Sequence, residues 1–383
     1  MKKYLLLVFG LVLIIDLAIV GCAKPAPTPT PAQPSPTTPA ASPTPQPSPS
    51  PQPSPTTPTA SPPPQEKKVY KWDMPYALYE GTWDWDVLVN WCDWVRRASG
   101  GRIDITPHGG GKIMPVSETF DAVSTGALKI DFTYGPYWTG KTPMAIYASG
   151  LPPFTLSRWA EYKVLYYYLG LQDLIREAYA KYNIYYLGTI PTNNCVMLSK
   201  RPVTTAADFK GLKMRATGMY GEVTAAAGAS VVFLPWSEIY GALEKGVIDA
   251  VIAGPLSSQC DSGFHEHTKY FLETPLTPVD CWSIHINMDT WKELPDDLKA
   301  VLEGSIGYAE NIFTASYFGH DAEWRGKLVK DFGFTVTRLS PEEQGKMHKY
   351  ALQVLDKYAA KDPLFAKATN ILKDYMRTLG YIK

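Results

Sequence analysis

The sequence has little cysteine, no excess of charge and none of the common catalytic signatures. Its 383 residues include only 5 Cys, and no two of them form a C-x-x-C pair, so a redox or zinc-ribbon role has little support. Lys plus Arg and Asp plus Glu both number 37, which removes the usual electrostatic basis for binding nucleic acid or an anionic membrane. The chain also lacks a G-x-S-x-G elbow, a P-loop and an H-E-x-x-H helix, so its motifs indicate no enzyme.

Proline is abundant, but only in one part of the chain. Eighteen of the 34 prolines fall between Pro25 and Pro64. The stretch from Ala23 to Gln65 contains almost only Pro, Thr, Ser, Ala and Gln, so it cannot bury a core and favours extended polyproline II. Fully extended at about 3.1 Å per residue, it would reach on the order of 130 Å. We therefore predict a disordered tether over residues 22–67, ahead of a folded body large enough for two lobes.

The N-terminus has the pattern of an export signal. Lys2 and Lys3 precede an apolar run over residues 5–15, which is too short for a comfortable transmembrane span. Ile19-Val20-Gly21-Cys22 resembles a bacterial lipobox, in which the cysteine becomes the lipidated first residue. The prediction is a lipoprotein signal peptide over residues 1–21, lipidation of Cys22 and an extracytoplasmic protein anchored to the cell membrane. A noncleaved membrane anchor is the alternative.

Four cysteines remain once Cys22 is assigned to lipid. An oxidising compartment permits disulfides, and four cysteines allow three connectivities. Cys260 and Cys281 are closest in sequence, so we expect them to be the pair if a disulfide forms. Cys92 and Cys195 are the other two.

Short strands alternate with helices along most of the body. This alternation predicts mixed sheets covered by helices, in two α/β lobes braced by a helical C-terminal third. The long pattern from Asp296 to about Asp331 predicts one helix, and residues 157–182 predict another long helix with a Tyr-rich face. The expected strands cover residues 69–72, 103–105, 130–134, 184–187, 212–215, 231–233, 247–252 and 282–288, and the other expected helices cover residues 83–98, 116–124, 206–209, 220–227, 236–244, 341–360 and 363–379.

An ordered set of motifs resembles the solute-binding proteins of tripartite ATP-independent periplasmic (TRAP) transporters, the DctP-type family. D-F-K-G-L-K-M-R at residues 208–215 is followed by Gly228-Ala229 and by E-I-Y-G-A-L-E-K-G-V-I-D at residues 238–249. Each fragment alone is weak, but their order is fairly specific, and the resemblance covers nearly all of residues 69–383. Further matching fragments lie at residues 99–103, 111–113, 122–131, 269–270, 286–287, 291 and 294–295.

The resemblance implies a two-lobed periplasmic-binding-protein-like fold with a long helix linking the lobes. We expect lobe I to comprise residues 68–192 plus about 279–328, and lobe II residues 193–278 plus about 329–383. It also implies that the chain captures a small organic acid between the lobes and delivers it to the integral membrane subunits of the transporter. No cofactor, catalytic residue or metal is implied.

Arg215 is the residue that the resemblance places at the ligand, because family members hold a carboxylate with the arginine at this position of the motif. A guanidinium at the end of a strand facing a cleft offers a planar, bidentate fork to a carboxylate. Without the resemblance, a surface arginine paired with an acid such as Glu222 is the simpler interpretation.

Two departures from the family pattern bear on the ligand. The Asn that many members carry soon after the D-G is absent from residues 249–255. Sialic-acid-type members have a second Arg just before the strand that leads to residues 199–202, where this sequence has Thr192-Asn193-Asn194. Both losses argue against a sialic acid and weaken the case for a tightly bound dicarboxylate. Asn194, or its neighbour Asn193, is a candidate amide donor near the hinge, although turn chemistry after Pro191 explains these residues equally well.

Aromatic residues cluster where the chain is expected to enter the cleft. They would enclose an apolar or aromatic acid whose carboxylate is fixed by Arg215, although core packing explains each one alone at least as well. The candidates are Tyr76, Tyr134, Trp138, Trp236, Tyr240 and Trp282.

Two other classes of function stay open at this point. One is a solute receptor for an ATP-driven importer or a sensor kinase, which the sequence separates poorly from the TRAP type. The other is a metal-dependent surface hydrolase that uses His265 and His267, which would share one face of a strand.

Overall fold

The computed structural model describes residues 68–156, 158–277 and 279–383, which belong to one compact unit from Gln65 to Lys383. The predicted signal peptide, Cys22 and the tether up to residue 67 lie outside the described residues. Among the helices of the described part, none combines the length and the apolar character that crossing a membrane requires.

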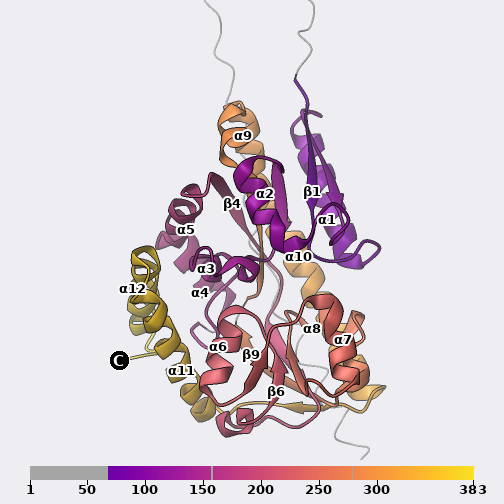
Figure 1. Ribbon diagram of the computed structural model, residues 1–383, viewed down its shortest axis with the longest axis vertical. Helices are drawn as coiled ribbons and strands as arrows, with labels where there is room; N and C mark the ends of the chain where they lie inside the picture. The colour runs from indigo at the N-terminus through magenta and orange to yellow at the C-terminus, as the bar shows by residue number, and fades with distance from the viewer. Residues whose placement is uncertain (1–67, 157, 278) are drawn as a thin grey trace, which may run out of the picture. The chain divides into compact units, whose positions relative to one another are not determined.

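The first lobe is built on short strands that come from both halves of the chain (Figure 1). β1 (Tyr70–Pro75) pairs in parallel with β2 (Ile103–His108), and a bridge from Tyr76 to Phe132 links β1 to β3 (Ile130–Thr133). β10 (Cys281–Asn287) lies between β3 and β4 (Ile184–Pro191) and is antiparallel to both. Ile103 and Ile105 of β2 are buried while the side chains between and after them are more exposed, which is the alternation expected of a strand with one covered face.

The second lobe contains a six-stranded mixed sheet. Its order is β11-β9-β5-β8-β6-β7, in which β5 is antiparallel to both of its neighbours and β6 is parallel to both of its own. The strand bounds are β5 Cys195–Ser199, β6 Lys213–Arg215, β7 Ser230–Val232, β8 Ala250–Ile252, β9 Tyr270–Thr277 and β11 Thr335–Thr337.

The chain passes between the first-lobe strands and the six-stranded sheet three times: once through α10 (Asp296–Lys330), which leads to β11, and twice through segments that lie side by side. One joins β4 to β5 and the other joins β9 to β10. The backbone N–H of Thr192 donates to the carbonyl of Asp280, and the N–H of Asp280 donates to the carbonyl of Asn193, both at 2.9 Å. This short antiparallel ladder places Asp280 at the junction of the lobes.

Helices cover the sheets of both lobes. Their bounds are α1 Trp83–Ala98, α2 Thr119–Thr125, α3 Ala145–Ala148, α4 Trp159–Lys163, α5 Leu171–Ala180, α6 Gly218–Ala226, α7 Trp236–Glu244, α8 Leu256–Asp261, α9 Met288–Glu293, α10 Asp296–Lys330, α11 Pro341–Ala359 and α12 Pro363–Thr378. Single 3₁₀ turns cover Val116–Glu118, Gly135–Trp138, Ala206–Phe209 and Phe264–His267.

The long C-terminal helices connect the two lobes, as the sequence predicts. α10 contacts α1 and β4 of the first lobe and α8 of the second. Its first turn carries Asp296 and Asp297 and its last turn Lys327 and Lys330, which matches the helix dipole at both ends. α11 packs on α6 and α12 packs on α5, and the two helices contact each other along one flank (Figure 1).

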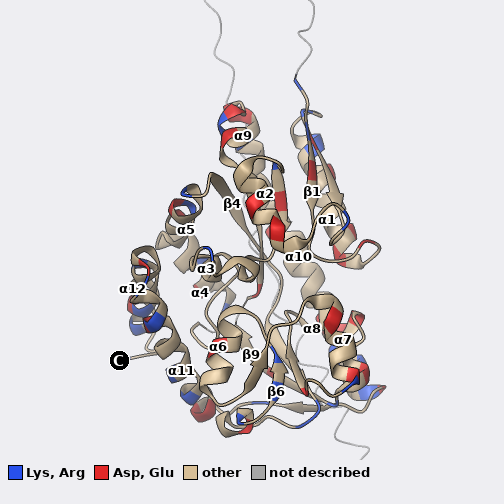
Figure 2. Ribbon diagram, viewed as in Figure 1, with Lys and Arg blue, Asp and Glu red and all other residues tan. Residues whose placement is uncertain are grey.

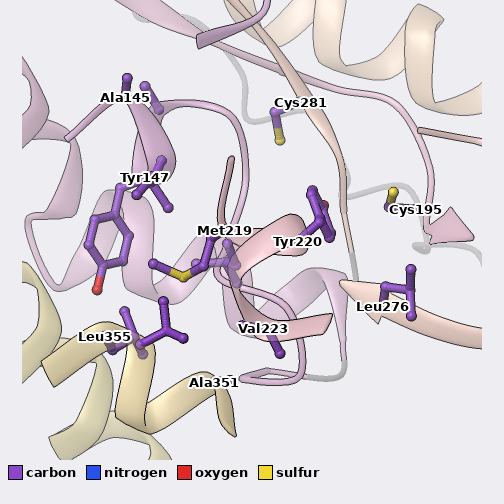
Figure 3. Packing of buried hydrophobic residues seen from close by; sticks show 14 of the residues in the cluster. Ala145, Tyr147, Cys195, Met219, Tyr220, Val223, Leu276, Cys281, Ala351 and Leu355 are labelled. Atoms are coloured by element: carbon purple, nitrogen blue, oxygen red, sulfur yellow. The ribbon is translucent and has the colours of Figure 1, made fainter. Parts of the chain in front are cut away.

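The largest hydrophobic cluster runs through both lobes and the C-terminal helices. Figure 3 shows Met219 and Val223 of α6 facing Ala351 and Leu355 of α11, with Tyr147 of α3 beside them. Two smaller clusters lie within the first and the second lobe. Figure 2 shows Lys and Arg interspersed with Asp and Glu along the outer helices.

The prediction of a single long helix over residues 157–182 is wrong. α4 is followed by a π-helical turn over Val164–Tyr168, and α5 starts only after Gly170. Gly170 has φ +82°, which is left-handed and ends the preceding helix because a glycine adopts it without steric cost.

The expected Cys260–Cys281 disulfide is also wrong, because all four described cysteines are free and buried. Cys260 lies on α8 in the core of the second lobe, whereas Cys281 begins β10 and belongs to the cluster shared by the lobes. Burial raises the pKa of both thiols. Buried, protonated thiols of this kind behave as small apolar side chains.

Candidate functional site

A small pocket lies between the lobes, around Arg215. It has a volume of about 40 Å³ and takes side chains from both lobes, and we call it the inner pocket. From the first lobe come Leu78, Tyr134, Tyr137, Asp280 and Trp282, and from the second come Cys195, Arg215, Thr217, Tyr220, Trp236, Ile252, Ala253, Gly254, Pro255 and Ser258.

Arg215 is buried at the end of β6, with an exposed fraction of only 3%. Its Nε donates to the carbonyl of Leu234 at 3.1 Å, and its Nη1 donates to the carbonyl of Ile252 at 3.0 Å. Among the described residues, no carboxylate comes within 4.0 Å of its nitrogens, and no partner is found for Nη2. Burial lowers the pKa of Arg215, but a guanidinium stays charged in proteins. The site therefore holds a buried positive charge that has no direct counter-ion among the described residues.

This environment excludes the alternative that Arg215 pairs with Glu222. The carboxylate of Glu222 instead contacts Lys357 and Tyr358 of α11.

Asp280 is the second charged residue of the inner pocket. The hydroxyl groups of Tyr134 and Tyr220 donate to its Oδ1 at 3.1 and 3.4 Å. The backbone N–H of Cys281 also donates a hydrogen bond to this carboxyl group, and among the described residues no side-chain donor to Oδ2 is found. Burial raises the pKa of Asp280 to about 7, and the two tyrosine hydroxyls and the charge of Arg215 oppose this rise.

This buried carboxyl makes the stability of the ligand-free protein depend on pH. An unfolded Asp has a pKa near 3.9, so between about pH 4 and pH 7 the native state holds a proton that the unfolded state releases. The free energy of unfolding therefore falls as the pH rises through this window. We expect Asp280→Asn to remove a decline on the order of 2 kcal/mol between pH 5 and pH 8. Thermal unfolding of both proteins at these two pH values checks this, and an equal decline in both would contradict it.

A larger pocket adjoins the inner one and shares Leu78, Trp236 and Ser258 with it. This outer pocket has a volume of about 200 Å³. The side chains that form the rest of its wall are mainly aromatic or carry hydroxyl groups, together with two carboxylates, and they are Tyr79, Thr82, Trp83, Asp84, Ser237, Tyr240, Asp261, Ser262 and Phe264.

The two carboxylates of the outer pocket already have partners. Asp84 accepts hydrogen bonds from the hydroxyl groups of Tyr76 and Tyr317, at 2.9 and 3.4 Å. Asp261 accepts from the indole N–H of Trp83 at 2.8 Å and from that of Trp324 at 2.7 Å. The bond from Trp83 on α1 to Asp261 on α8 joins the two lobes at the edge of the pocket.

Five of the predicted ligand-binding residues meet at these pockets. Arg215, Tyr134, Trp236 and Trp282 line the inner pocket, and Tyr240 lines the outer one together with Trp236. The ring of Trp282 lies 5.8 Å from that of Tyr134, centroid to centroid. The structure therefore brings together side chains from four distant parts of the sequence.

The other three predicted residues lie outside the walls of both pockets. Tyr76 is fully buried and donates to Asp84, and Trp138 donates from its indole N–H to the hydroxyl of Tyr179 at 3.1 Å in the cluster shared by the lobes. Asn194 lies half-buried in the crossing segment. Its neighbour Asn193 donates to Asp321 at 2.7 Å, and so ties this segment to α10.

Sequence reasoning missed Asp280, Tyr220 and Asp261. No local motif marks Asp280, and its importance follows only from the pairing of the two crossing segments. Tyr220 lies in a segment predicted to be a helix, but nothing in the sequence indicates which face it presents to the pocket.

The histidines considered for a metal site are arranged differently from the prediction. His265 and His267 lie on a 3₁₀ turn, not on a strand. The ring of His265 packs against Trp324 and Phe332, and that of His267 against Tyr240. Within the described ranges, no three His, Cys, Asp or Glu side chains are grouped to hold a metal ion, so this pair lacks the third ligand that the hydrolase hypothesis needs.

Comparison with known proteins gives one consistent family. The model of the DctP family, described as bacterial extracellular solute-binding protein, family 7, matches residues 79–362. The chain is 27% identical over 288 residues to the monocarboxylate 2-oxoacid-binding periplasmic protein of Nostoc sp. (strain PCC 7120), an alignment that covers 74% of this chain and 78% of the relative.

Solved structures give the same result. A TRAP periplasmic solute-binding protein from Colwellia psychrerythraea, solved with calcium and pyruvate, is 25% identical and superposes with a TM-score of 0.74 over 82% of this chain and 96% of its own. One from Pseudoalteromonas atlantica, solved with sodium and pyruvate, is 25% identical with a TM-score of 0.73 and the same coverage. This family and fold are those of solute receptors rather than enzymes. The chain therefore belongs to the DctP family, the extracytoplasmic two-lobed solute-binding proteins of TRAP transporters.

Proposed function

We propose that this protein captures a small organic acid in the inner pocket, with the ligand's carboxylate held by Arg215, and releases it unchanged to the membrane subunits of a TRAP transporter. The observation that carries the proposal is the buried guanidinium of Arg215, which has two backbone partners and no carboxylate within 4.0 Å among the described residues. A charge in this state is costly unless a counter-ion arrives, and a carboxylate is the counter-ion that a guanidinium fits best.

The walls of the pocket suggest how binding would favour closure. Tyr134 and Trp282 come from the first lobe, and Arg215 and Trp236 from the second. A ligand shifts an equilibrium between open and closed states only through its difference in affinity for them, so contacts from both lobes are needed. The lobe boundaries predicted from the sequence, near residues 192, 278 and 328, are part of this proposal.

The names of relatives agree with an acid as the ligand. The Nostoc protein is named for monocarboxylate 2-oxoacids, and the two solved structures contain pyruvate. A second carboxylate on the ligand would be disfavoured, because the outer pocket has Asp84 and Asp261 on its wall and no Lys or Arg among its lining residues. We infer a monocarboxylate rather than a dicarboxylate.

A thermal-shift screen of the purified protein against mono-, di-, keto- and aromatic carboxylates tests this function. A ligand at 100 times its dissociation constant adds about 2.7 kcal/mol of stability, which shifts the unfolding temperature by a few degrees. We expect hits among monocarboxylates. A ligand-free, folded protein that responds to none of these acids would contradict the proposal.

We also propose that Cys22 is lipidated and anchors the protein to the cell membrane through the Pro-rich tether. The support is the sequence Ile19-Val20-Gly21-Cys22 after a short apolar run. We expect the native protein to fractionate with membranes and Cys22→Ser to be processed differently and lose acylation. Mass spectrometry of the mature N-terminus decides this, and an unmodified cysteine would overturn it.

A further inference from the structure

Carboxyl groups outnumber cationic side chains on the pocket walls, and this difference bears on the charge of the ligand. The inner and outer pockets together are lined by one cationic side chain, Arg215, and by three carboxyl groups, those of Asp280, Asp84 and Asp261. A ligand that is only an anion neutralises Arg215 but offers no donor to Asp280, which above its pKa of about 7 then stays an uncompensated charge in the same buried space. Such a charge is expensive to bury unless it finds a partner.

One oxygen of Asp280 lacks a side-chain donor among the described residues and can accept from such a partner. Its Oδ1 accepts from both tyrosine hydroxyls and the backbone N–H of Cys281 also donates to the carboxyl group, whereas no side-chain donor to Oδ2 is found among the described residues. A Cβ added to Gly254, another residue of the inner-pocket wall, would lie 3.1 Å from Oδ2. Oδ2 is therefore on the pocket side of the carboxylate, and only a residue without a side chain leaves this space open.

The size of the inner pocket limits how far apart the ligand's two polar groups can be. The pocket of about 40 Å³ has room for only a few heavy atoms. Arg215 and Asp280 both line it without touching each other. A short head group that carries its acidic and its donor group on neighbouring carbon atoms fits this arrangement.

We propose that the solute is a zwitterionic 2-amino acid with an apolar or aromatic side chain. Its carboxylate pairs with Arg215, its ammonium group donates to Oδ2 of Asp280, and its side chain extends past Trp236 into the outer pocket. The inference rests on the proposed function, because it assumes that Arg215 holds a carboxylate. It adds the second charge of the ligand and the role of Asp280.

The outer pocket suits such a side chain. Its wall contains the rings of Tyr79, Trp83, Trp236, Tyr240 and Phe264. Aromatic faces offer a large apolar contact area, and the serine and threonine hydroxyls among them carry no charge. Because Leu78, Trp236 and Ser258 line both pockets, a side chain can pass from one to the other without leaving the cleft.

Isothermal titration of the purified protein at pH 8, above the pKa of Asp280, against two matched series of acids tests the inference. The long series is L-phenylalanine, L-phenyllactate, phenylpyruvate and 3-phenylpropionate, which differ only in the group next to the carboxylate. The short series is L-alanine, L-lactate, pyruvate and propionate. In at least one series we expect the amino acid to bind about tenfold tighter than the hydroxy acid and about a hundredfold tighter than the other two.

Two variants separate this inference from the function on which it rests. We expect Asp280→Asn, which keeps the shape of the side chain, to lower the affinity for the amino acid by about thirtyfold or more. The affinity for the unsubstituted acid should change by less than about threefold. We expect Arg215→Lys to weaken the binding of every acid in both series. Melting curves of both variants without ligand establish that they fold.

Each outcome has one meaning. Equal affinities across a series, unaffected by Asp280→Asn, would overturn the inference but leave the proposed function standing. Tightest binding of the 2-oxo acid, dependent on added Ca²⁺ or Na⁺ and lost in Asp280→Asn, would make Asp280 a cation ligand and would also overturn it. Failure of all eight acids to bind the folded protein would count against the proposed function itself.

Discussion

Replacing Arg215 by Ala is expected to weaken acid binding by about 2 to 5 kcal/mol, which is roughly 30-fold to several thousand-fold. The guanidinium is buried and lacks a counter-ion, so the ligand's carboxylate would lose its only cationic partner among the residues that line the two pockets. Isothermal titration of both proteins with the best hit from the thermal-shift screen measures this loss of affinity. If the affinity of Arg215→Ala stays within about threefold of that of the unmodified protein, Arg215 does not bind the ligand's carboxylate.

Arg201 provides a matched control for this variant. It also donates hydrogen bonds to two backbone carbonyls, those of Asp208 and Lys210, but it is exposed and lies outside both pocket walls. Arg201→Ala should therefore leave acid binding unchanged. Equal losses in the two variants would indicate a general effect of removing an arginine from the second lobe, not a contact with the ligand.

The largest expected effect on stability is at a buried pair in the first lobe. His285 of β10 and Asp131 of β3 are 1% and 0% exposed, and Nδ1 of the histidine lies 2.6 Å from Oδ1 of the aspartate. The ring of Tyr179 stacks on the imidazole at a centroid distance of 5.0 Å. The other ring nitrogen, Nε2, has no partner among the described residues.

Asp131→Ala should lower the free energy of unfolding by about 3 to 5 kcal/mol, because it leaves the imidazole buried without any partner. The matched control is Asp93→Ala, which removes the exposed pair with Arg96 and should cost at most about 1 kcal/mol. Denaturant unfolding measures both. A loss at Asp131 no greater than that at Asp93 would contradict the assignment of this pair to the core.

The parts of the fold that follow from local patterns could be predicted from the sequence. The helix expected from Asp296 to about Asp331 is observed as Asp296–Lys330, because a proline, two acids and a continuous helical pattern specify it locally. The sequence does not predict the break at Gly170, since an apolar and tyrosine-rich pattern continues across it. The π-helical turn before it has no sequence signature that we recognise.

The site could be predicted only where chemistry and family pattern coincide. Arg215, Trp236 and Trp282 lie at the pocket, whereas Trp138 and Tyr76 face the core, because an aromatic residue after a strand can turn either way. Asp280 depends on a contact between segments some 90 residues apart, Thr192 to Asp280, so no local pattern could reveal it.

A crystal structure of the protein with its tightest-binding acid tests the central claim most directly. We predict that both carboxylate oxygens lie within hydrogen-bond distance of the guanidinium of Arg215, with the ligand enclosed by Trp236 and Trp282 from opposite lobes. A solute bound elsewhere, with Arg215 still bonded only to the carbonyls of Leu234 and Ile252, would contradict it.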